Sequence, residues 1–392
     1  MAAWPQTLIE NTMMLLRRPL LIALLGLTGL TGLTGLCSSA QAQIRIGQTA
    51  GFTGAAASGV NEATAGAQLY FNAVNARGGI GGQKLELVSM DDKFEPKLAL
   101  DNAKALIDKG VIALFLTRGT PHSLGLLPLL AEQRVTLVAP STGAMALHDP
   151  VNPWVFNVRA TYQREAERAV KHLLQIGVQR IAIVQVADSF GDDAVQGALR
   201  GFGSTSKPVA YDKFDRSKPD FAPIMPRIVA ADAQAVLVIA SGTIAADAMK
   251  ALRAAGSKAQ LLTLSNNASA GFIKALGELA RGVIVSQVLP PERGLGAAMV
   301  KEAHDLARAV GSTGPEITPA LLEGFAGAKV LVEGLKRAAA KRDLSRTGLQ
   351  QALEGLTRFD LGGLELGYSA TDHTGLDYAD LSIVGADGRF RR

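Results

Sequence analysis

The chain has 392 residues, of which 48% are hydrophobic, and its 40 Lys and Arg residues outnumber its 35 Asp and Glu residues to give a formal net charge of +5. A chain of this length is too long for one compact core and predicts two domains. Its only dense basic run is residues 389–392, so the basic footprint of a nucleic-acid-binding protein is absent. Cys37 is the only cysteine, which excludes a disulfide framework and a cysteine-based metal site.

The first 42 residues have the pattern of a secretory signal. A basic pair at residues 17–18 precedes an apolar stretch over residues 20–36, and Ala40 and Ala42 follow with the small-residue spacing that signal peptidase accepts. We therefore expect residues 1–42 to be a signal peptide that is removed after export.

Two alternatives to a cleaved signal remain open, an uncleaved membrane anchor and lipidation of Cys37. The apolar stretch is shorter than the ~20 residues that a spanning helix needs. Cys37 follows Leu36 rather than the small residue that a lipoprotein signal requires. Both observations favour cleavage.

From residue 43, short apolar runs alternate with longer helical patterns. This alternation predicts a mainly parallel sheet with helices on both faces. Pro96 stands in the first turn of one predicted helix, where its missing N–H costs nothing. The predicted strands are 44–48, 85–90, 112–116 and 136–139. One predicted helix ends at residue 74, and two others cover 96–108 and 123–132.

A second series of the same kind begins after residues 150–153. The run 180–186 is almost continuously apolar, as expected of a strand buried on both faces. Asp387-Gly388 predicts a hairpin turn between two short terminal strands. The other predicted strands are 209–211, 235–240, 261–264 and 283–287, and the predicted helices are 161–176, 192–199, 221–231, 243–255, 270–279, 297–310 and 319–339.

Several sequence blocks, which occur in the same order, resemble the leucine/isoleucine/valine-binding type of periplasmic binding protein. The resemblance covers residues 43–392, and each block alone is weak. It implies an α/β fold of two doubly wound, Rossmann-like lobes joined by three crossover segments, the type I periplasmic binding protein fold. The blocks are 74–82 (VNARGGIGG), Asp91-Asp92 with Pro96, Gly119-Thr120-Pro121, 158–162 (VRATY), Phe190-Gly191 and 252–256 (LRAAG).

The same resemblance implies how the chain is divided between the lobes. The first lobe is expected to comprise residues 43–160 and 283–375. The second lobe is expected to comprise residues 161–282 and 376–392.

The sequence gives little support for catalysis, a metal or a cofactor. The glycines at 47, 51 and 54 depart from the dinucleotide-binding spacing, and Asp91-Asp92 lies beyond the expected acidic position. None of the five histidines has a histidine partner four residues away, although His122 stands at a strand-to-helix turn. We therefore expect no enzyme activity, no metal and no cofactor, with an NAD-dependent oxidoreductase as the alternative.

Two polar loops are the leading candidates for ligand binding, because open α/β sheets place ligands at the carboxyl ends of strands. Thr120 lies in the first loop, at the start of a helix, and Ser141, Thr142 and Gly143 lie in the second. The resemblance implies that these two turns hold a ligand carboxylate. Capping of a helix N-terminus is the alternative role for their hydroxyl groups.

In the second lobe, the chain departs from the amino-acid binders that it resembles. Phe190 and Ser241 stand where those proteins have tyrosines, and a tyrosine of the first lobe aligns near Gly59. Tyr162 follows the first crossover and is expected to line the cleft. The resemblance therefore implies ligand contacts for Phe190, Ser241 and Tyr162 that differ from those of the amino-acid binders.

The acidic residue that binds the ligand ammonium in the family aligns near Ser265. A buried ammonium without a carboxylate is costly, so either Asp188 replaces the acid or the ligand is not an α-amino acid. We expect leucine, isoleucine and valine to bind poorly. We expect a ligand with a carboxylate at one end and an uncharged body that packs against Phe190 and Tyr162. An aromatic body is one alternative.

Together these features predict a periplasmic solute-binding component of an ABC importer, monomeric and without nucleic-acid partners. Its ligand would be a small carboxylate, amino-acid-like or an organic or aromatic acid, and its protein partners would be the permease subunits. A sensor subunit that presents its closed form to a membrane receptor is the alternative, because the same cleft serves both roles.

The export signal generates the first testable prediction. Protein recovered from the periplasm should begin at Gln43, because signal peptidase cleaves after a small-x-small pattern such as Ala40-Gln41-Ala42. N-terminal sequencing or intact mass measurement checks this. A membrane-retained product that keeps residues 1–42 would contradict it.

Overall fold

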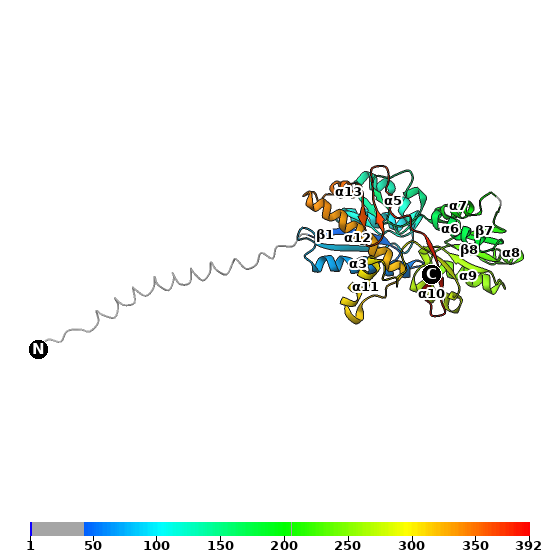
Figure 1. The fold of residues 1–392 in the computed structure, drawn as a ribbon. Coiled ribbons are helices and arrows are strands. Elements are labelled where there is room, and N and C mark those ends of the chain that lie inside the picture. The colour runs from blue at the N-terminus through cyan, green and yellow to red at the C-terminus, as the bar shows by residue number, and fades with distance from the viewer. Residues whose placement is uncertain (2–42, 205) are drawn as a thin grey trace. The chain divides into compact units, whose positions relative to one another are not determined.

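The computed structural model describes Met1, residues 43–204 and residues 206–392. The predicted signal peptide, with Cys37 and the proposed cleavage pattern, lies outside the described residues. Residues 43–392 form two α/β lobes, each built on its own sheet (Figure 1).

The first lobe is built on a five-stranded sheet with the order β2-β1-β3-β4-β5. Every pair of neighbouring strands in it is parallel. Side chains along the strands alternate between two cores, because successive residues point to opposite faces. Leu114 thus contacts one core, while Ala113 and Phe115 contact the other. The strands are β1 (Gln43–Ala50), β2 (Lys84–Asp91), β3 (Ala113–Phe115), β4 (Thr136–Val138) and β5 (Val155–Phe156).

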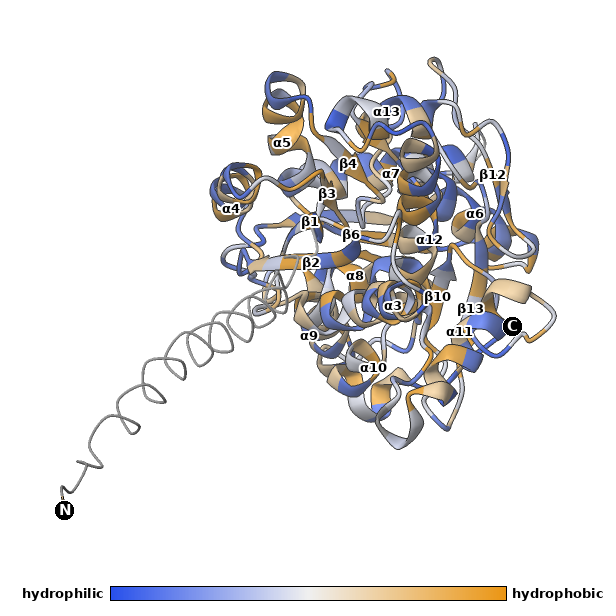
Figure 2. Ribbon diagram, turned by 90° about the vertical axis from the view of Figure 1, so that its left-hand side faces the viewer, coloured by the Kyte–Doolittle hydropathy of each residue, from blue (hydrophilic) through white to orange (hydrophobic). Residues whose placement is uncertain are grey.

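Helices cover both faces of this sheet. One face packs against α4 and α5, and the other packs against α3, α11 and α12. Surface helices such as α4 carry hydrophilic and hydrophobic residues side by side (Figure 2), as an amphipathic helix on a core must. The helices are α3 (Ala57–Ala76), α4 (Pro96–Asp108), α5 (Thr120–Gln133), α11 (Ala298–Ala309), α12 (Pro319–Ala340) and α13 (Arg346–Glu354), with 3₁₀ turns at Met145–Leu147 and Gly311–Thr313.

The second lobe is built on a seven-stranded sheet with the order β14-β13-β10-β9-β8-β6-β7. Its neighbouring strands are parallel except at one edge, where β13 pairs antiparallel with both β10 and β14. All six residues of β6 are buried, in agreement with the apolar run in the sequence. The strands are β6 (Ile181–Val186), β7 (Ala210–Phe214), β8 (Ala235–Ile239), β9 (Gln260–Thr263), β10 (Ile284–Gln287), β13 (Asp380–Val384) and β14 (Phe390–Arg391).

Five helices pack on the second sheet. α6 carries a stripe of buried residues three and four positions apart, which faces the core of the lobe. The helices are α6 (Tyr162–Gln175), α7 (Ser189–Phe202), α8 (Met225–Ala230), α9 (Gly242–Ala254) and α10 (Ala270–Leu276), with 3₁₀ turns at Ser265–Asn267 and Gly277–Ala280.

The division of the chain differs in one place from the expected one. We expected the first lobe to resume at residue 283, but β10 pairs with β9 and β13 in the second sheet. Packing into the first core resumes at Val288. The apolar strand at 284–287 belongs to the second lobe because its hydrogen-bonding partners are there, which sequence alone does not reveal.

Three segments connect the lobes: one precedes α6, one follows β10 and one precedes β13. The α/β fold with three crossovers is therefore as predicted. Helix α4 begins and ends where predicted, and the hairpin at Asp387-Gly388 joins β13 to β14. β5, α13 and the small hairpin of β11 (Phe359–Asp360) and β12 (Glu365–Leu366) were not predicted from the sequence. β5, β11 and β12 each have only two residues, too few for a periodicity.

Helices α3 and α12 approach each other closely because glycines stand at their contact. A Cβ on Gly324 would lie 1.7 Å from the carbonyl oxygen of Ala63, and a Cβ on Gly66 would lie 1.9 Å from that of Leu321. Such distances allow no side chain without displacing a helix. This contact fixes the start of α12, which carries Glu323.

Substitution at this contact generates the second prediction. Gly324→Ala should lower the free energy of unfolding by about 3 kcal/mol, the upper end of the cost of overpacking, because the obstructing atom is backbone. Gly125→Ala is the matched control: the glycine is exposed in α5 with no atom near its Cβ position, and the change should stabilise by about 0.5–1 kcal/mol. Urea unfolding measures both, and equal stabilities would contradict the prediction.

Candidate functional site

Two polar loops follow β3 and β4, at the carboxyl ends of these strands. Leu116 and Ala139 adopt left-handed φ angles of 53° and 52°, which cost a non-glycine residue about 1–3 kcal/mol. The turns bring Arg118 beside Ser141 in an isolated parallel bridge. The loop after β3 therefore contributes an arginine, which the sequence analysis did not select.

Arg118 is a buried cation that contacts both lobes. Its Nη1 donates to Ser141 Oγ at 2.8 Å in the first lobe, and its Nη2 donates to the carbonyl oxygen of Asn266 at 2.5 Å in the second. Only 5% of the residue is exposed. No carboxylate of residues 43–204 or 206–392 forms an ion pair with it; the buried pairs nearby belong to Arg159, and a half-buried pair belongs to Arg216. An unpaired buried charge is costly, so Arg118 is suited to an anionic group.

A cavity of about 230 Å³ lies between the lobes beside Arg118. Drug-sized ligands occupy roughly 300–1,000 Å³, so this cavity fits a smaller molecule. Gly59 leaves room next to the guanidinium, since a Cβ there would lie 3.6 Å from Nη2. Apart from Arg118 and Asn266, the walls are mostly small residues: Gly54, Ala55, Ala56, Ala57, Ser58, Gly59, Gly242, Thr243, Ser269, Gly271, Phe272 and Ala275.

Small residues also allow the lobes to touch around this cavity. The amide of Thr243 donates to the carbonyl oxygen of Ala55 at 3.1 Å. A Cβ on Gly242 would lie 1.7 Å from that same oxygen, and a Cβ on Gly271 would lie 1.7 Å from Ser58 Oγ. The structure therefore shows the lobes in contact, and side chains at Gly242 or Gly271 would prevent it.

Arg159, in the first crossover segment, is the centre of a buried ion-pair network. It hydrogen-bonds to Glu165 Oε1 of α6, donates from Nη2 to Ser265 Oγ at 2.6 Å, and places Nη1 3.5 Å from Glu323 Oε1 of α12. Arg159 is 2% exposed, and Glu165 is completely buried. Burial disfavours the charge, but Glu323 and Glu165 outweigh it and raise the pKa of Arg159, which stays charged.

The network continues to Arg118 through hydrogen bonds. Ser141 Oγ accepts from Arg118 and donates to Glu323 Oε1 at 2.8 Å. On the other side, Glu165 Oε2 accepts from the amide of Ser265 at 2.9 Å and from the hydroxyl of Ser286. A connected line of polar groups thus crosses from the first lobe to the second.

The two predicted aromatic ligand residues pack on each other beside this network. The rings of Tyr162 and Phe190 are 4.7 Å apart at 59°, and Arg159 lies 4.6 Å from the centre of the Tyr162 ring. Both aromatic residues are 3% exposed, and neither lines the cavity beside Arg118. In this closed form they pack under the network.

The loop residues predicted to bind a carboxylate are buried, but they differ in their contacts. Thr120 does not cap α5: Gly119 is the N-cap, and Thr120 Oγ1 lies 2.7 Å from Thr142 Oγ1. The capping alternative is therefore wrong for Thr120. Gly143 accepts from the amide of Tyr162 and has no room for a side chain. Of these residues, Ser141 alone contacts a charged group of the network.

Ser241 and Ser265 flank Asn266, a second residue that the sequence analysis missed. Asn266 Nδ2 donates to the carbonyl oxygen of Ala240 at 3.1 Å and to Ser241 Oγ at 3.0 Å, which fixes the orientation of the amide. Its Oδ1 is buried and has no hydrogen-bond partner in the described part of the chain. Because Asn266 lines the cavity, this oxygen is a candidate acceptor for a ligand donor.

Asp188, considered as a substitute acid, has other partners. It caps α7 by accepting from the amides of Phe190 and Gly191, and it pairs with Arg216 at 2.5 Å. Arg216 in turn lies 4.9 Å from the centre of the Phe94 ring in the first lobe. Asp188 thus helps to position an interlobe contact and is not free to bind an ammonium.

His122 stacks on the same aromatic ring. Its imidazole lies 4.7 Å from Phe94 at 19°, and neither ring nitrogen has a hydrogen-bond partner among the described residues. Burial lowers the pKa of His122 to about 4, and nearby Arg216 acts in the same direction. The ring is therefore neutral at neutral pH.

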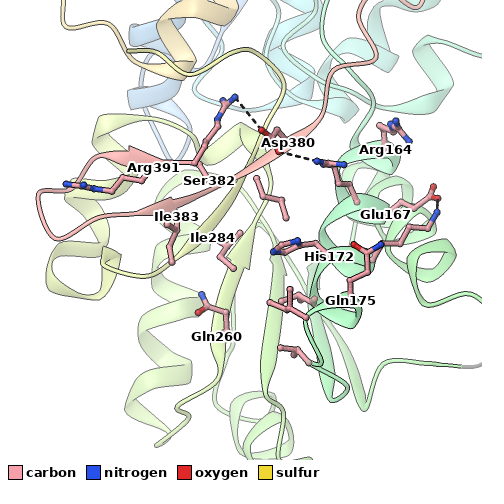
Figure 3. A pocket seen from close by; sticks show the side chains of 17 residues that line it. Arg164, Glu167, His172, Gln175, Gln260, Ile284, Asp380, Ser382, Ile383 and Arg391 are labelled. Carbon is pink, nitrogen blue, oxygen red and sulfur yellow. Dashed lines mark hydrogen bonds and ion pairs between the residues drawn. The ribbon is translucent and has the colours of Figure 1, made fainter. Parts of the chain in front are cut away.

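A pocket of about 700 Å³ lies elsewhere, on the second lobe between α6 and strands β9, β10 and β13 (Figure 3). Within it Arg168 pairs with Asp380 at 3.3 Å. None of the predicted ligand residues lines it. Within residues 43–204 and 206–392, no helix is long and apolar enough to cross a membrane, and no three His, Cys, Asp or Glu side chains form a group suited to a metal ion.

The sequence contained signals for two of the missed residues. Glu165 occupies the buried stripe of α6, between Tyr162 and Ala166, where an apolar residue is expected. Glu323 is the only acid in the apolar stretch 319–332. A lone carboxylate on an apolar face indicates a buried partner. Nothing in the spacing indicated that both would meet Arg159.

Two α/β lobes that close on a small cavity, with a buried polar network between them, define the class of protein that traps a solute by domain closure. The chain belongs to the periplasmic binding protein family, whose model matches residues 43–388. The predicted resemblance is thereby confirmed, and so is the prediction of a binding protein rather than an enzyme, because its relatives are substrate-binding proteins.

Individual relatives agree with the family match. A substrate-binding periplasmic protein from Ralstonia solanacearum is 30% identical, with a TM-score of 0.81 over 89% of this chain and 99% of that one. A possible leucine/isoleucine/valine-binding protein from Rhodopirellula baltica shares the fold, with 24% identity and a TM-score of 0.84 over 91% and 98%. The Leu/Ile/Val-binding protein of Escherichia coli is 23% identical over 62% of this chain and 67% of its own length.

The buried imidazole generates the third prediction. The pKa of His122 is lowered to about 4 from an ordinary 6.5. The contribution of the neutral imidazole to the free energy of unfolding is therefore fully present above pH 6.5 and is lost as the pH falls towards 4. Between pH 7 and pH 5 the wild type should lose about 2 kcal/mol more than His122→Phe, because phenylalanine cannot be protonated and can still stack on Phe94. Urea unfolding at both pH values measures this, and contributions from other groups cancel in the difference. Equal losses in the two proteins would contradict it.

Proposed function

We propose that this protein is the extracytoplasmic solute-binding component of an ABC importer, and that it traps a small carboxylate-bearing ligand between its lobes. One observation carries the proposal: Arg118 is a buried cation without an acidic partner in the described chain, and it lines the interlobe cavity. A ligand carboxylate would supply the missing charge. Charge-assisted hydrogen bonds to guanidinium are among the strongest polar contacts in proteins.

Contacts of Arg118 with both lobes link binding to closure. Its guanidinium touches Ser141 on one side of the cavity and Asn266 on the other. An anion bound there would neutralise a charge that closure buries. The ligand would thus stabilise the closed state over the open one, which is the requirement for ligand-driven closure.

The proposed site uses part of the predicted set of ligand residues. Ser141 orients Arg118, and Ser241 orients Asn266. Thr120, Thr142 and Gly143 support the loops around them. Tyr162 and Phe190 form the packed base beneath the network, and Ser265 fixes Arg159.

The proposed role in transport follows from the family together with the export signal. In that role the protein is secreted into the periplasm and delivers its ligand to permease subunits in the membrane. Its relatives include Leu/Ile/Val-binding proteins, and the arginine in the cavity wall fits the carboxylate of an amino acid or of another organic acid.

The fourth prediction tests the carboxylate site. Arg118→Met should weaken binding of the carboxylate ligand at least a hundredfold, because breaking a buried charge pair costs about 3–5 kcal/mol. Arg118→Lys should lose less, since it keeps the charge. A thermal-shift panel of acetate, butyrate, hexanoate, lactate and benzoate, followed by calorimetry, identifies and quantifies the ligand class.

The melting temperature of the ligand-free variants is the control. Arg118→Met removes a buried charge that has no acidic partner, and replacing such a charge by an apolar side chain is neutral or stabilising, so the melting temperature should not fall. Two results would reject the proposal: no carboxylate stabilises the wild type, or Arg118→Met binds the same acid with unchanged affinity.

A further inference from the structure

We infer that Arg159 is an internal cation that occupies the two buried carboxylates between the lobes, and that it thereby restricts the ligand to acids without an ammonium group. This inference rests on the proposed function, because it names the ligand class of the same site. It assigns a specificity role to a residue that lies outside the cavity wall.

The geometry places Arg159 between the only two acids of the network. Glu165 comes from α6 of the second lobe and Glu323 from α12 of the first, and Arg159 pairs with both from the crossover segment. Glu165 is completely buried and Glu323 is 9% exposed. Neither carboxylate lines the cavity, and each would be buried without a cation if Arg159 were absent, which is costly.

The remaining acids beside the cleft also have partners. Asp188 pairs with Arg216 and caps α7. Glu62 of α3 accepts from the amides of Ala270 and Gly271 and from Thr318 Oγ1. Asp188 thus has a cation and two amide donors, and both oxygens of Glu62 accept hydrogen bonds from the described chain.

The charge at the cavity wall points the same way. Of the four charged groups of the network, Arg118 lines the cavity, whereas Arg159, Glu165 and Glu323 do not. A carboxylate bound at Arg118 adds one negative charge beside a guanidinium that has no ion pair of its own. The guanidinium of Arg118 already donates from Nη2 to the backbone oxygen of Asn266 at 2.5 Å. A ligand ammonium in the cavity would lie near this guanidinium, and the two positive charges would repel each other.

One buried atom indicates what the ligand carries in place of an ammonium. Asn266 Oδ1 is an acceptor without a partner among the described residues, on a residue that is 5% exposed and lines the cavity. A hydroxyl or amide N–H satisfies such an acceptor at a lower desolvation cost than an ammonium does. The ligand class is thus a small carboxylic acid with an uncharged hydrogen-bond donor or no donor at all.

The first test compares ligands that share one carbon skeleton. Calorimetry with the wild type should use leucine, 2-hydroxy-4-methylpentanoate and 4-methylpentanoate, and the shorter set of alanine, lactate and propionate. The hydroxy acid or the unsubstituted acid should bind at least tenfold more tightly than the amino acid in any set that binds. An amino acid that binds as tightly as its matched acids would overturn the inference while leaving the proposed carboxylate site intact.

The second test has a first readout, the melting temperature, that does not depend on the natural ligand. Arg159→Ala removes the internal cation and leaves Glu165 and Glu323 buried without it. Methylguanidinium at millimolar concentration should raise the melting temperature of Arg159→Ala but not that of the wild type, and the preference for hydroxy acid over amino acid should fall at least tenfold. Sodium chloride at equal ionic strength is the control for screening.

Matched variants separate specificity from folding. Arg159→Lys keeps a cation and should keep the preference, whereas the triple variant Arg159→Met with Glu165→Gln and Glu323→Gln should fold without gaining affinity for methylguanidinium. Arg168→Ala, on the exposed side of α6, should behave as the wild type. If Arg159→Ala does not fold, refolding it with methylguanidinium should recover soluble protein, and failure of both recovery and stabilisation would overturn the inference.

Discussion

The guanidinium of Arg159, buried between carboxylates from two different lobes, is the interaction on which the arrangement of the site depends. It stands in a crossover segment, so the same side chain touches the connection, α6 and α12. Buried ion pairs repay the loss of hydration only when geometry and extra hydrogen bonds are good. Here Ser265, Ser286 and Ser141 supply those hydrogen bonds to the three charged groups, which ties the interior of each lobe to the position of the other.

That pairing gives the two arginines of the cleft opposite roles. Arg159 has two acids, and Arg118 has only neutral acceptors in the described residues. A protein tolerates an unpaired buried cation poorly, so in the proposed function an anion would accompany closure around Arg118. The unequal distribution of acids between two neighbouring arginines is the basis on which we propose that the cleft binds anions and disfavours a second ligand charge.

Small residues make this closure geometrically feasible. Gly242 and Gly271 stand where the lobes touch, and Gly66 and Gly324 stand where α3 meets α12. The first pair lets the cavity close over Arg118. The second pair sets the position of α12 and so of Glu323. Backbone contacts at these glycines therefore decide where the charged groups lie, and larger residues would separate groups that the network requires within hydrogen-bonding distance.

The sequence by itself determined the alternation of strands and helices, the two-lobed class and the two polar loops, because periodicity and turn residues are local properties of the chain. It also placed Ser141, Ser241 and Ser265 near the cleft. It did not reveal that Arg118 lacks an acid while Arg159 has two. Glu165 lies six residues from Arg159, a spacing that fixes no contact between a crossover segment and a helix, and Glu323 is far from both arginines in the chain. Only the tertiary structure decided which acid meets which base, because burial and pairing depend on contacts between residues more than a hundred positions apart, such as Arg159 with Ser265 and Ser141 with Glu323.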